Sequence, residues 1–181
     1  MSLSWKTLHS LYNSIIGKSV LIVSLATPVA LMYNATSFIP SQFPWVLLGA
    51  LIALVGYVFV EVFTPELVKD FKNAHHYSSS LIEISANVDW VSEFKILEEN
   101  VSTLKSDVDG YSVKPYEFKT IEATKKFIGE DRAIRSLALI KFNHVNLSGV
   151  WKRRILTASF YMSIILIFSS TILHIKTILI G

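Results

Sequence analysis

One almost uncharged stretch in the first half of the chain constrains the fold more than any other feature. From Trp45 to Phe63 the sequence is apolar for 19 residues, and its one charged residue, Glu61, lies near the end. At 1.5 Å per residue such a helix is about 28 Å long, enough to cross the hydrocarbon core of a bilayer. Because a soluble domain needs charge on its surface, we predict a membrane-spanning helix here.

Two further apolar runs lie on either side of this one. Residues 155–173 contain no charged residue, whereas the run at about 17–34 is shorter, with Lys18 at its edge and Pro28 inside it. About half of the 181 residues are apolar and 17% are charged, and the mean hydropathy is +0.46. We therefore predict a mostly α membrane protein with three transmembrane helices. The predicted parts are an N-terminal segment at 1–18, a transmembrane hairpin at 19–64, a domain at 65–154, and a third span with a short end at 155–181.

The N-terminal segment has two interpretations. Leu3, Leu8 and Leu11 fall on one side of a helix, with Trp5 beside them, and Lys6 suits anionic head groups. This pattern is typical of an amphipathic helix at a membrane surface. The same residues could instead be the first turns of the first span.

The segment between the second and third spans predicts a mainly helical domain. Thr64 and Pro65 are typical of a helix start, so we expect a helix from Pro65 to about Tyr77, ended by the serines at 78–80. Leu81–Val88 alternates well enough for a strand but also fits a helix. Asp-Gly and a proline within Asp107–Pro115 indicate a turn or a short hairpin. The remaining helices are expected at Asp89–Leu104, Thr120–Phe127 and Arg132–Val145.

The basic residues indicate the orientation. Fourteen of the 17 basic residues lie in 65–154, and Lys152-Arg153-Arg154 immediately precedes the third span. Positively charged flanks of a span are retained on the cytoplasmic side of the membrane. This positive-inside rule predicts that the N-terminus and the domain lie inside the cell and that the C-terminus lies outside. We expect an integral protein of the inner, or cytoplasmic, membrane of a bacterium.

No residue pattern indicates an enzyme. The sequence has no metalloprotease, phosphate-loop, nucleophile-elbow or dinucleotide motif, and it has no cysteine. His75 and His76 are neighbours, so on a helix they point about 100° apart and chelate one ion poorly. Asp107-Val108-Asp109-Gly110 lacks the later ligands of a calcium loop. We therefore expect no catalytic residue, no metal and no cofactor, and the balanced charge of the domain argues against nucleic acid.

Two basic clusters are candidate binding sites. The first could bind a phosphate, a nucleotide messenger or an acidic partner. Acidic residues lie between its basic residues in the sequence, however, and this mixture favours an ordinary solvated face. The second is typical of a head-group anchor at the membrane surface. The first cluster is Lys125, Lys126, Arg132 and Arg135, and the second is Trp151, Lys152, Arg153 and Arg154.

Small and hydroxyl side chains indicate how the spans associate. Gly49, Ala53 and Gly56 would let another helix approach closely, which predicts helix packing and a homo-oligomer. The serines and threonines of the third span could line a pore in such an oligomer, or could hydrogen-bond to nearby backbone carbonyls.

Together these features predict a small multi-pass membrane sensor or effector. The domain would bind a cytosolic partner protein or signalling ligand, and the oligomeric spans would perturb the membrane or open a pore. The layout resembles that of small membrane components of bacterial antiviral defence systems, and the resemblance implies such a role. The alternative is a structural or immunity-type membrane protein that binds one partner without channel activity.

Overall fold

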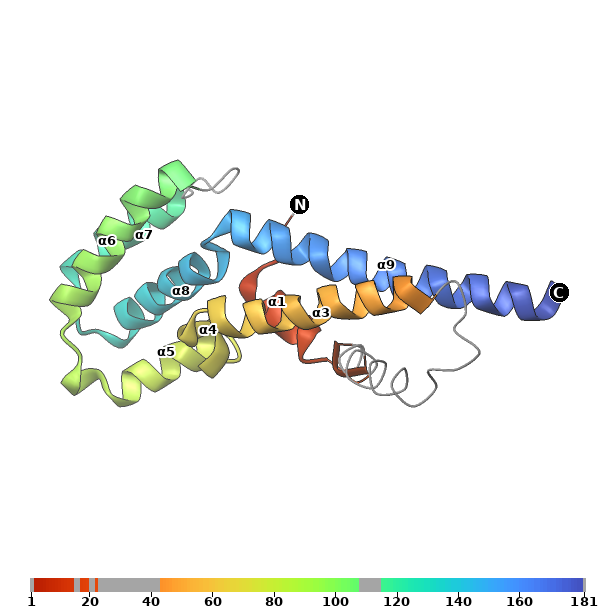
Figure 1. Ribbon diagram of the computed structural model, residues 1–181. Helices are drawn as coiled ribbons and strands as arrows, with labels where there is room; N and C mark the ends of the chain where they lie inside the picture. Colours follow the sequence, from red (N-terminus) through yellow and green to blue (C-terminus); the bar gives the residue numbers. More distant parts are fainter. Residues whose placement is uncertain (1, 15–16, 20–21, 23–42, 108–114, 181) are drawn as a thin grey trace. The chain divides into compact units, whose positions relative to one another are not determined.

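The computed structural model describes residues 2–14, 17–19, 22, 43–107 and 115–180 (Figure 1). This part of the chain is mostly helical and contains no strand, which confirms the mostly α prediction. Most of the predicted first span at about 17–34, and residues 108–114 of the turn predicted within Asp107–Pro115, lie outside the described residues. The helices are α1 (Trp5–Tyr12), α3 (Phe43–Phe63), α4 (Glu66–Asp70), α5 (Ala74–Glu83), the 3₁₀ turn η1 (Ser85–Asn87), α6 (Trp90–Asp107), α7 (Pro115–Lys126), α8 (Asp131–Leu147) and α9 (Val150–Ile180).

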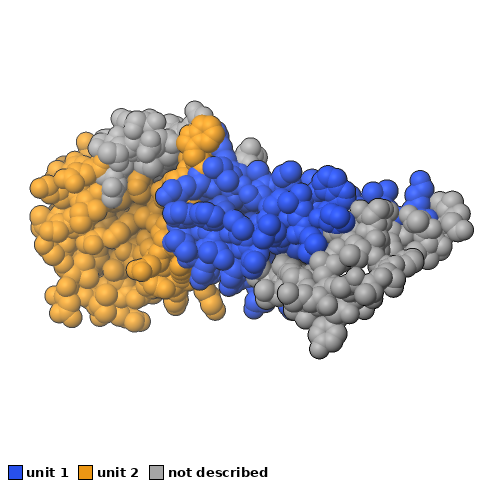
Figure 2. Space-filling view, viewed as in Figure 1, with its two compact units in different colours: residues 1–3, 7–63, 152–181 blue, residues 4–6, 64–151 orange. Residues whose placement is uncertain are grey.

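The chain forms two compact units, which Figure 2 colours separately. Unit 1 consists of residues 1–3, 7–63 and 152–181, and unit 2 of residues 4–6 and 64–151. Each is described by itself below. The boundaries predicted at residues 18, 64 and 154 remain predictions.

In unit 1, α3 and α9 run antiparallel. Near the start of α3, a Cβ on Gly49 would lie 3.0 Å from Leu166 Cβ, and at its end Phe63 lies under Lys152, whose Nζ is 4.4 Å from the ring centroid. As residue numbers rise along α3, the numbers of the α9 residues that contact it fall, as expected for antiparallel helices. Close approach at Gly49 is possible because glycine has no side chain to hold the backbones apart.

One helix in the described part of the chain, Pro44–Phe63, is long and apolar enough to cross a membrane. This supports one of the three predicted spans, but the prediction of three is not supported as a whole. The apolar run predicted as the third span, from residue 155, lies within the 31 residues of α9. This helix begins five residues earlier, at Val150, and includes the basic residues Lys152, Arg153 and Arg154. Whether α9 also crosses a bilayer is taken up as a proposal below.

In unit 2, α8 is the central helix and packs against α4, α5, α6 and α7. Buried residues on α8 recur at helical spacing, so one face of α8 supplies both core clusters. The first cluster joins α6, α7 and α8, and the second joins α5 and α8. They are Phe94, Leu97, Ile121 and Leu137, and Ala74, Tyr77, Ala138 and Phe142.

The predicted helix from Pro65 to Tyr77 is wrong, because the structure has two helices there. α4 ends at Asp70, and α5 starts after Asn73, whose side chain accepts a hydrogen bond of 2.8 Å from the His76 N–H. This cap starts a new helix and satisfies one of its first N–H groups. The N-cap residue of α4 is Pro65 and not Thr64. The Thr64 hydroxyl is buried and has no hydrogen-bond partner in the described residues.

The predicted break at the serines and the strand option for Leu81–Val88 are also wrong. Ser78 lies inside α5, where its hydroxyl donates to the carbonyl of His75 at 2.8 Å. A serine that satisfies its hydroxyl on the preceding turn does not need to leave the helix. Residues 81–83 continue α5, and 85–87 form the 3₁₀ turn η1.

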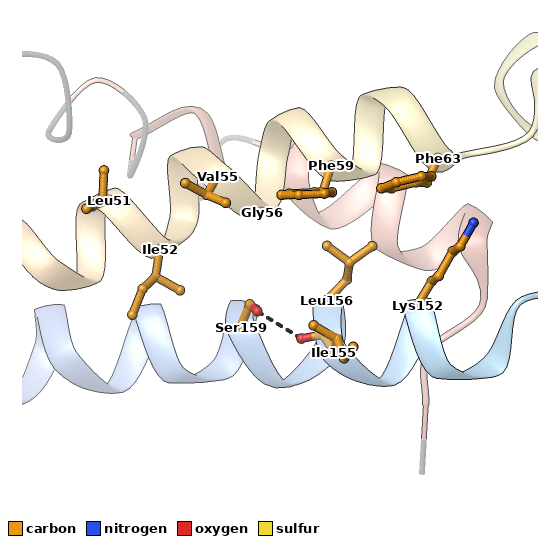
Figure 3. A pocket seen from close by; sticks show the side chains of 10 residues that line it. All are labelled: Leu51, Ile52, Val55, Gly56, Phe59, Phe63, Lys152, Ile155, Leu156 and Ser159. Atoms are coloured by element: carbon orange, nitrogen blue, oxygen red, sulfur yellow. Dashed lines mark hydrogen bonds between the residues drawn. The ribbon is translucent and has the colours of Figure 1, made fainter.

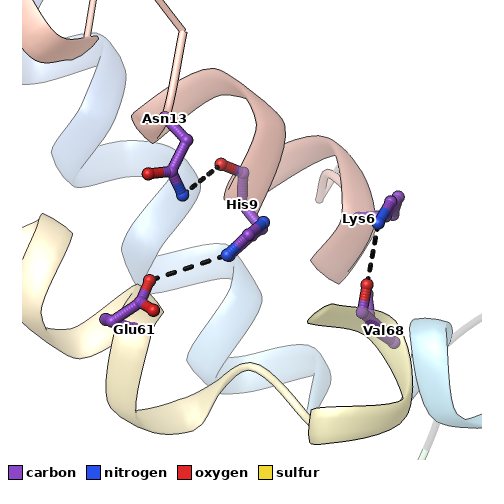
Figure 4. A network of polar contacts seen from close by, with 5 residues as sticks. All are labelled: Lys6, His9, Asn13, Glu61 and Val68. Atoms are coloured by element: carbon purple, nitrogen blue, oxygen red, sulfur yellow. Dashed lines mark hydrogen bonds and ion pairs between the residues drawn. The ribbon is translucent and has the colours of Figure 1, made fainter. Parts of the chain in front are cut away.

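Lys6 closes the end of α4 within unit 2 (Figure 4). Its ammonium donates to the carbonyls of Val68 at 2.8 Å and Phe71 at 2.9 Å, which are acceptors of the kind left unpaired at a helix C-terminus. Burial lowers the pKa of Lys6 from its ordinary value. The head-group role expected for Lys6 is replaced by this capping role.

Candidate functional site

A pocket of about 570 Å³ lies on unit 2 between α7 and α8. Its volume is in the range of small-molecule sites. Two cations, one carboxylate, one aromatic ring and three hydroxyl groups surround it. The lining residues are Lys119, Thr120, Ala123, Thr124, Phe127, Glu130, Arg132, Ala133 and Ser136.

Helical spacing and one tight turn place these side chains together. Lys119, Ala123 and Phe127 are four residues apart on and just after α7, and Arg132 and Ser136 are four apart on α8, so each set shares one face. Between the helices, Gly129 has φ of +100°, a conformation that residues with a Cβ rarely adopt. The turn at Gly129 brings the two faces to the same pocket.

Two of the pocket hydroxyls already have backbone partners. Thr124 donates to the Thr120 carbonyl at 2.6 Å, and Ser136 donates to the Arg132 carbonyl at 3.1 Å. Each hydroxyl oxygen can still accept a hydrogen bond from a ligand. The charged groups for recognition are therefore Arg132, Lys119 and Glu130.

The four basic residues predicted as a ligand cluster do not gather at one place. Arg132 alone lines the pocket. Lys125 lies 3.9 Å from a Glu98 carboxylate oxygen and 5.7 Å from the Phe94 ring centroid, while Lys126 and Arg135 are exposed and do not line it. Lys119 and Phe127 were not predicted from the sequence, although their four-residue spacing with Ala123 along α7 is a signal for a shared face.

A second polar cluster in unit 2 links α5, α6 and α8. Lys141 forms an ion pair with Glu93, and Tyr77 also contributes to this cluster. Burial lowers the pKa of Lys141, but the interactions with Glu93 and Tyr77 outweigh it, so the net direction is upward. The pKa of Tyr77 is raised, mainly by burial. The ion pair therefore links α6 to α8, and Tyr77 connects this cluster to α5.

His144 lies on the buried face of α8. Its Nδ1 is buried with no hydrogen-bond partner in the described part of the chain, and burial lowers its pKa. His75 and His76 are exposed near the start of α5, where His76 lies 5.6 Å from the Phe71 ring. Across the described residues no group of three potential metal ligands is found.

The predicted head-group anchor divides into residues with different surroundings. Trp151 and Lys152 are exposed, but Arg153 is only 3% exposed. Arg153 Nη1 donates to the Leu3 carbonyl at 2.7 Å and to the Ser2 hydroxyl at 3.2 Å within unit 1. Arg153 thus fixes the N-terminal residues to the start of α9.

The small residues predicted for helix packing have partners inside the chain. Gly49 lies against Ser163, Leu166 and Ile167 of α9, and a Cβ on Gly56 would lie 2.3 Å from the Tyr12 hydroxyl. Ala53 is buried. Within one chain, α9 and α1 already cover this face of α3. The small residues therefore no longer support association with a second copy, and the homo-oligomer remains a prediction without this support.

Three hydroxyls of α9 bond to their own helix. Thr157, Ser159 and Ser163 donate to carbonyls three or four residues earlier, at 2.7 to 2.9 Å, and Thr157 and Ser163 are buried. This arrangement agrees with local backbone bonding, the second of the two interpretations above. Also in unit 1, a carboxylate oxygen of Glu61 lies 3.6 Å from His9 Nε2, and the Asn13 side-chain amide donates to the His9 carbonyl (Figure 4).

A groove of about 520 Å³ lies between α3 and α9 in unit 1 (Figure 3). Apart from Lys152 and Ser159, its side chains are apolar. The lining residues are Leu51, Ile52, Val55, Gly56, Phe59, Phe63, Lys152, Ile155, Leu156 and Ser159.

No protein-family model, curated protein or solved structure matches the chain. The function is therefore argued from the geometry of the two units.

Proposed function

We propose that this protein is a membrane-anchored sensor whose helical unit 2 binds a small phosphorylated ligand in the pocket between α7 and α8. The observation that carries this proposal is the meeting of Arg132, Lys119 and an exposed aromatic ring, Phe127, at one pocket. A guanidinium binds phosphate oxygens in a bidentate manner, and an aromatic ring can stack on a base. A nucleotide offers both groups.

The anchor in this proposal is α3, with α9 crossing the bilayer beside it. Large apolar side chains on the outside of α3 and α9 are exposed, among them Val62 and Phe168. Exposed apolar surface on two long helices suits a lipid environment. Adding the first apolar run gives three crossings, and the basic residues near the start of α9 would keep unit 2 on the cytoplasmic side.

The ligand proposal is tested by titrating the full-length protein in detergent with mononucleotides and cyclic dinucleotides, by isothermal calorimetry. We expect Arg132→Gln to weaken binding about tenfold or more, because a hydrogen bond to a charged group contributes roughly 1.5–3 kcal/mol. Arg135→Gln is the matched control, since Arg135 lies on the same helix outside the pocket. Equal losses in both variants, or no binding by the wild type, would refute the proposed site.

The second candidate is a structural or immunity-type membrane protein that binds one partner and has no channel. Its support is the small-residue face of α3, which α9 and Tyr12 occupy within the chain, together with the backbone-bonded hydroxyls of α9. Both features reduce the polar surface from which a pore could be built. Purified protein in dye-filled vesicles, with and without the ligand found by calorimetry, separates the two: ligand-dependent release supports an effector, and retention supports the second candidate.

A further inference from the structure

The groove between α3 and α9 has a length and a lining that suit a flexible apolar chain. It extends along α3 from Leu51 to Phe63, which is about 18 Å at 1.5 Å per residue. Its volume of about 520 Å³ is that of a ligand site rather than a packing defect. Figure 3 shows the side chains of Val55, Phe59 and Ile155 beside it.

The polar groups of the groove are distributed unevenly. Ser159 donates its hydroxyl to the Ile155 carbonyl at 2.9 Å, so its donor is already used. The one charged lining residue, Lys152, lies at the Phe63 end, with its ammonium 4.4 Å from the ring centroid. The ion pairs His9–Glu61, Lys125–Glu98 and Lys141–Glu93 of the described residues do not involve Lys152. The groove is thus apolar along its length and positive at one end.

We propose that this groove binds an anionic phospholipid, with one acyl chain along α3 and the phosphate at the ammonium of Lys152. The inference rests on the membrane anchoring proposed above. An anionic head group followed by an uncharged chain has the same order of charge and apolar surface as the groove. Lys152 also starts the basic cluster that precedes the uncharged run of α9, so it lies where head groups would be in that arrangement.

Two lipids that differ only in the head group test the proposal. The full-length protein is placed in vesicles of phosphatidylcholine that contain a trace of either phosphatidylglycerol or phosphatidylcholine with a photoreactive group on the acyl chain. After illumination, mass spectrometry maps the labelled residues. We expect phosphatidylglycerol to label the lining positions of α3 and α9 more strongly than phosphatidylcholine does.

Matched variants separate the groove from the general lipid-facing surface. Val55→Phe fills the groove, whereas Val58→Phe adds the same volume at an exposed position of α3 that does not line it. We expect the first to abolish the preferential labelling and the second to leave it unchanged. Lys152→Gln should weaken the preference for phosphatidylglycerol about fivefold, as expected for one basic residue near a head group. Lys95→Gln, at an exposed position of α6 in unit 2, should change it little. Circular dichroism and gel filtration check that each variant is folded.

Three results would overturn the proposal. Equal labelling at positions 55 and 58 would mean ordinary contact with bulk lipid, and equal labelling by the two lipids would remove the role of Lys152. If Val55→Phe instead abolishes a cross-linked dimer, a second copy occupies the groove. Each of these results leaves the anchoring intact, whereas release of the protein from vesicles by alkaline carbonate would refute the proposed function itself.

Discussion

Unit 1 and unit 2 place their apolar side chains in opposite ways. In unit 1 the outer surfaces of α3 and α9 expose a series of large apolar residues such as Val62, which is 69% exposed, with no charge among them over most of their length. In unit 2 the apolar residues meet inside, as at Phe94 and Leu137. Unit 2 also has exposed apolar residues, for example Val91 at 70%, but charged residues stand close beside it in α6.

The difference is the one expected if unit 1 contacts lipid, as proposed above, and unit 2 contacts water. A helix with apolar residues outside and small or polar residues inside suits lipid, where the apolar surface needs no cover. A helix with an apolar stripe on one face suits water, where that stripe must be buried. Substitutions at matched positions in the two units should therefore have different effects, and they can break or sharpen the comparison.

The largest effect is expected in the core of unit 2. Phe94→Ala removes a 4% exposed ring from the cluster of α6, α7 and α8 and should lower the free energy of unfolding by about 3–5 kcal/mol. Urea unfolding of the full-length protein in mild detergent, followed by circular dichroism, measures it. Val91→Ala, at an exposed position on the same helix, should change it by less than about 0.5 kcal/mol. A loss below about 1 kcal/mol for Phe94→Ala would mean that this cluster is not a core.

The next effect tests the surface of unit 1 directly. Leu51→Arg puts a charge on the exposed side of α3 and should make insertion less favourable by about 3 kcal/mol, the cost of an arginine near the middle of a span. Val91→Arg should leave insertion unchanged. The carbonate-resistant fraction in membranes reports both. If the two variants insert equally well, the exposed face of α3 does not contact lipid.

A smaller effect is expected where α3 meets α9. Gly49→Leu must displace the Ser163 carbonyl and the Leu166 side chain, since even a Cβ would lie 3.0–3.1 Å from them. Overpacking of this kind costs about 1–3 kcal/mol. Distances between spin labels on the two helices should increase. Leu48→Ala, next to it on the exposed side, is the control and should leave the distances unchanged.

The smallest effect concerns pH and His144 in unit 2. Burial lowers the folded-state pKa of this histidine below its unfolded value of 6.5, so the unfolded state takes up a proton that the folded state does not. Stability should therefore fall as pH drops below about 6.5, by at most about 1.4 kcal/mol per pH unit. His144→Gln should flatten this part of the profile relative to the wild type. Parallel profiles for the two proteins would show that His144 does not contribute.

Periodicity was a good guide to the helices and a poor one to their ends. The apolar spacing predicted helices at Asp89–Leu104, Thr120–Phe127 and Arg132–Val145, and the structure has helices over each of these ranges. It did not predict the break after Asp70, where the ammonium of Lys6, which is distant in sequence, donates to the carbonyls of Val68 and Phe71. The pocket was found only in part for a similar reason: Arg132 was a candidate, but its partner Lys119 lies on another helix, and the turn at Gly129 brings them together.

By itself, the sequence determined that α3 is a long apolar helix with one charged residue and that the segment after it is helical, because these properties depend on composition and on spacing within one element. Only the tertiary structure decided what the cations do. Lys152 and Arg153 are adjacent in the sequence. Lys152 lies at the end of an apolar groove, whereas Arg153 is buried and donates a hydrogen bond to the carbonyl of Leu3. Burial and hydrogen bonding depend on neighbours brought from elsewhere in the chain, and no local pattern contains them.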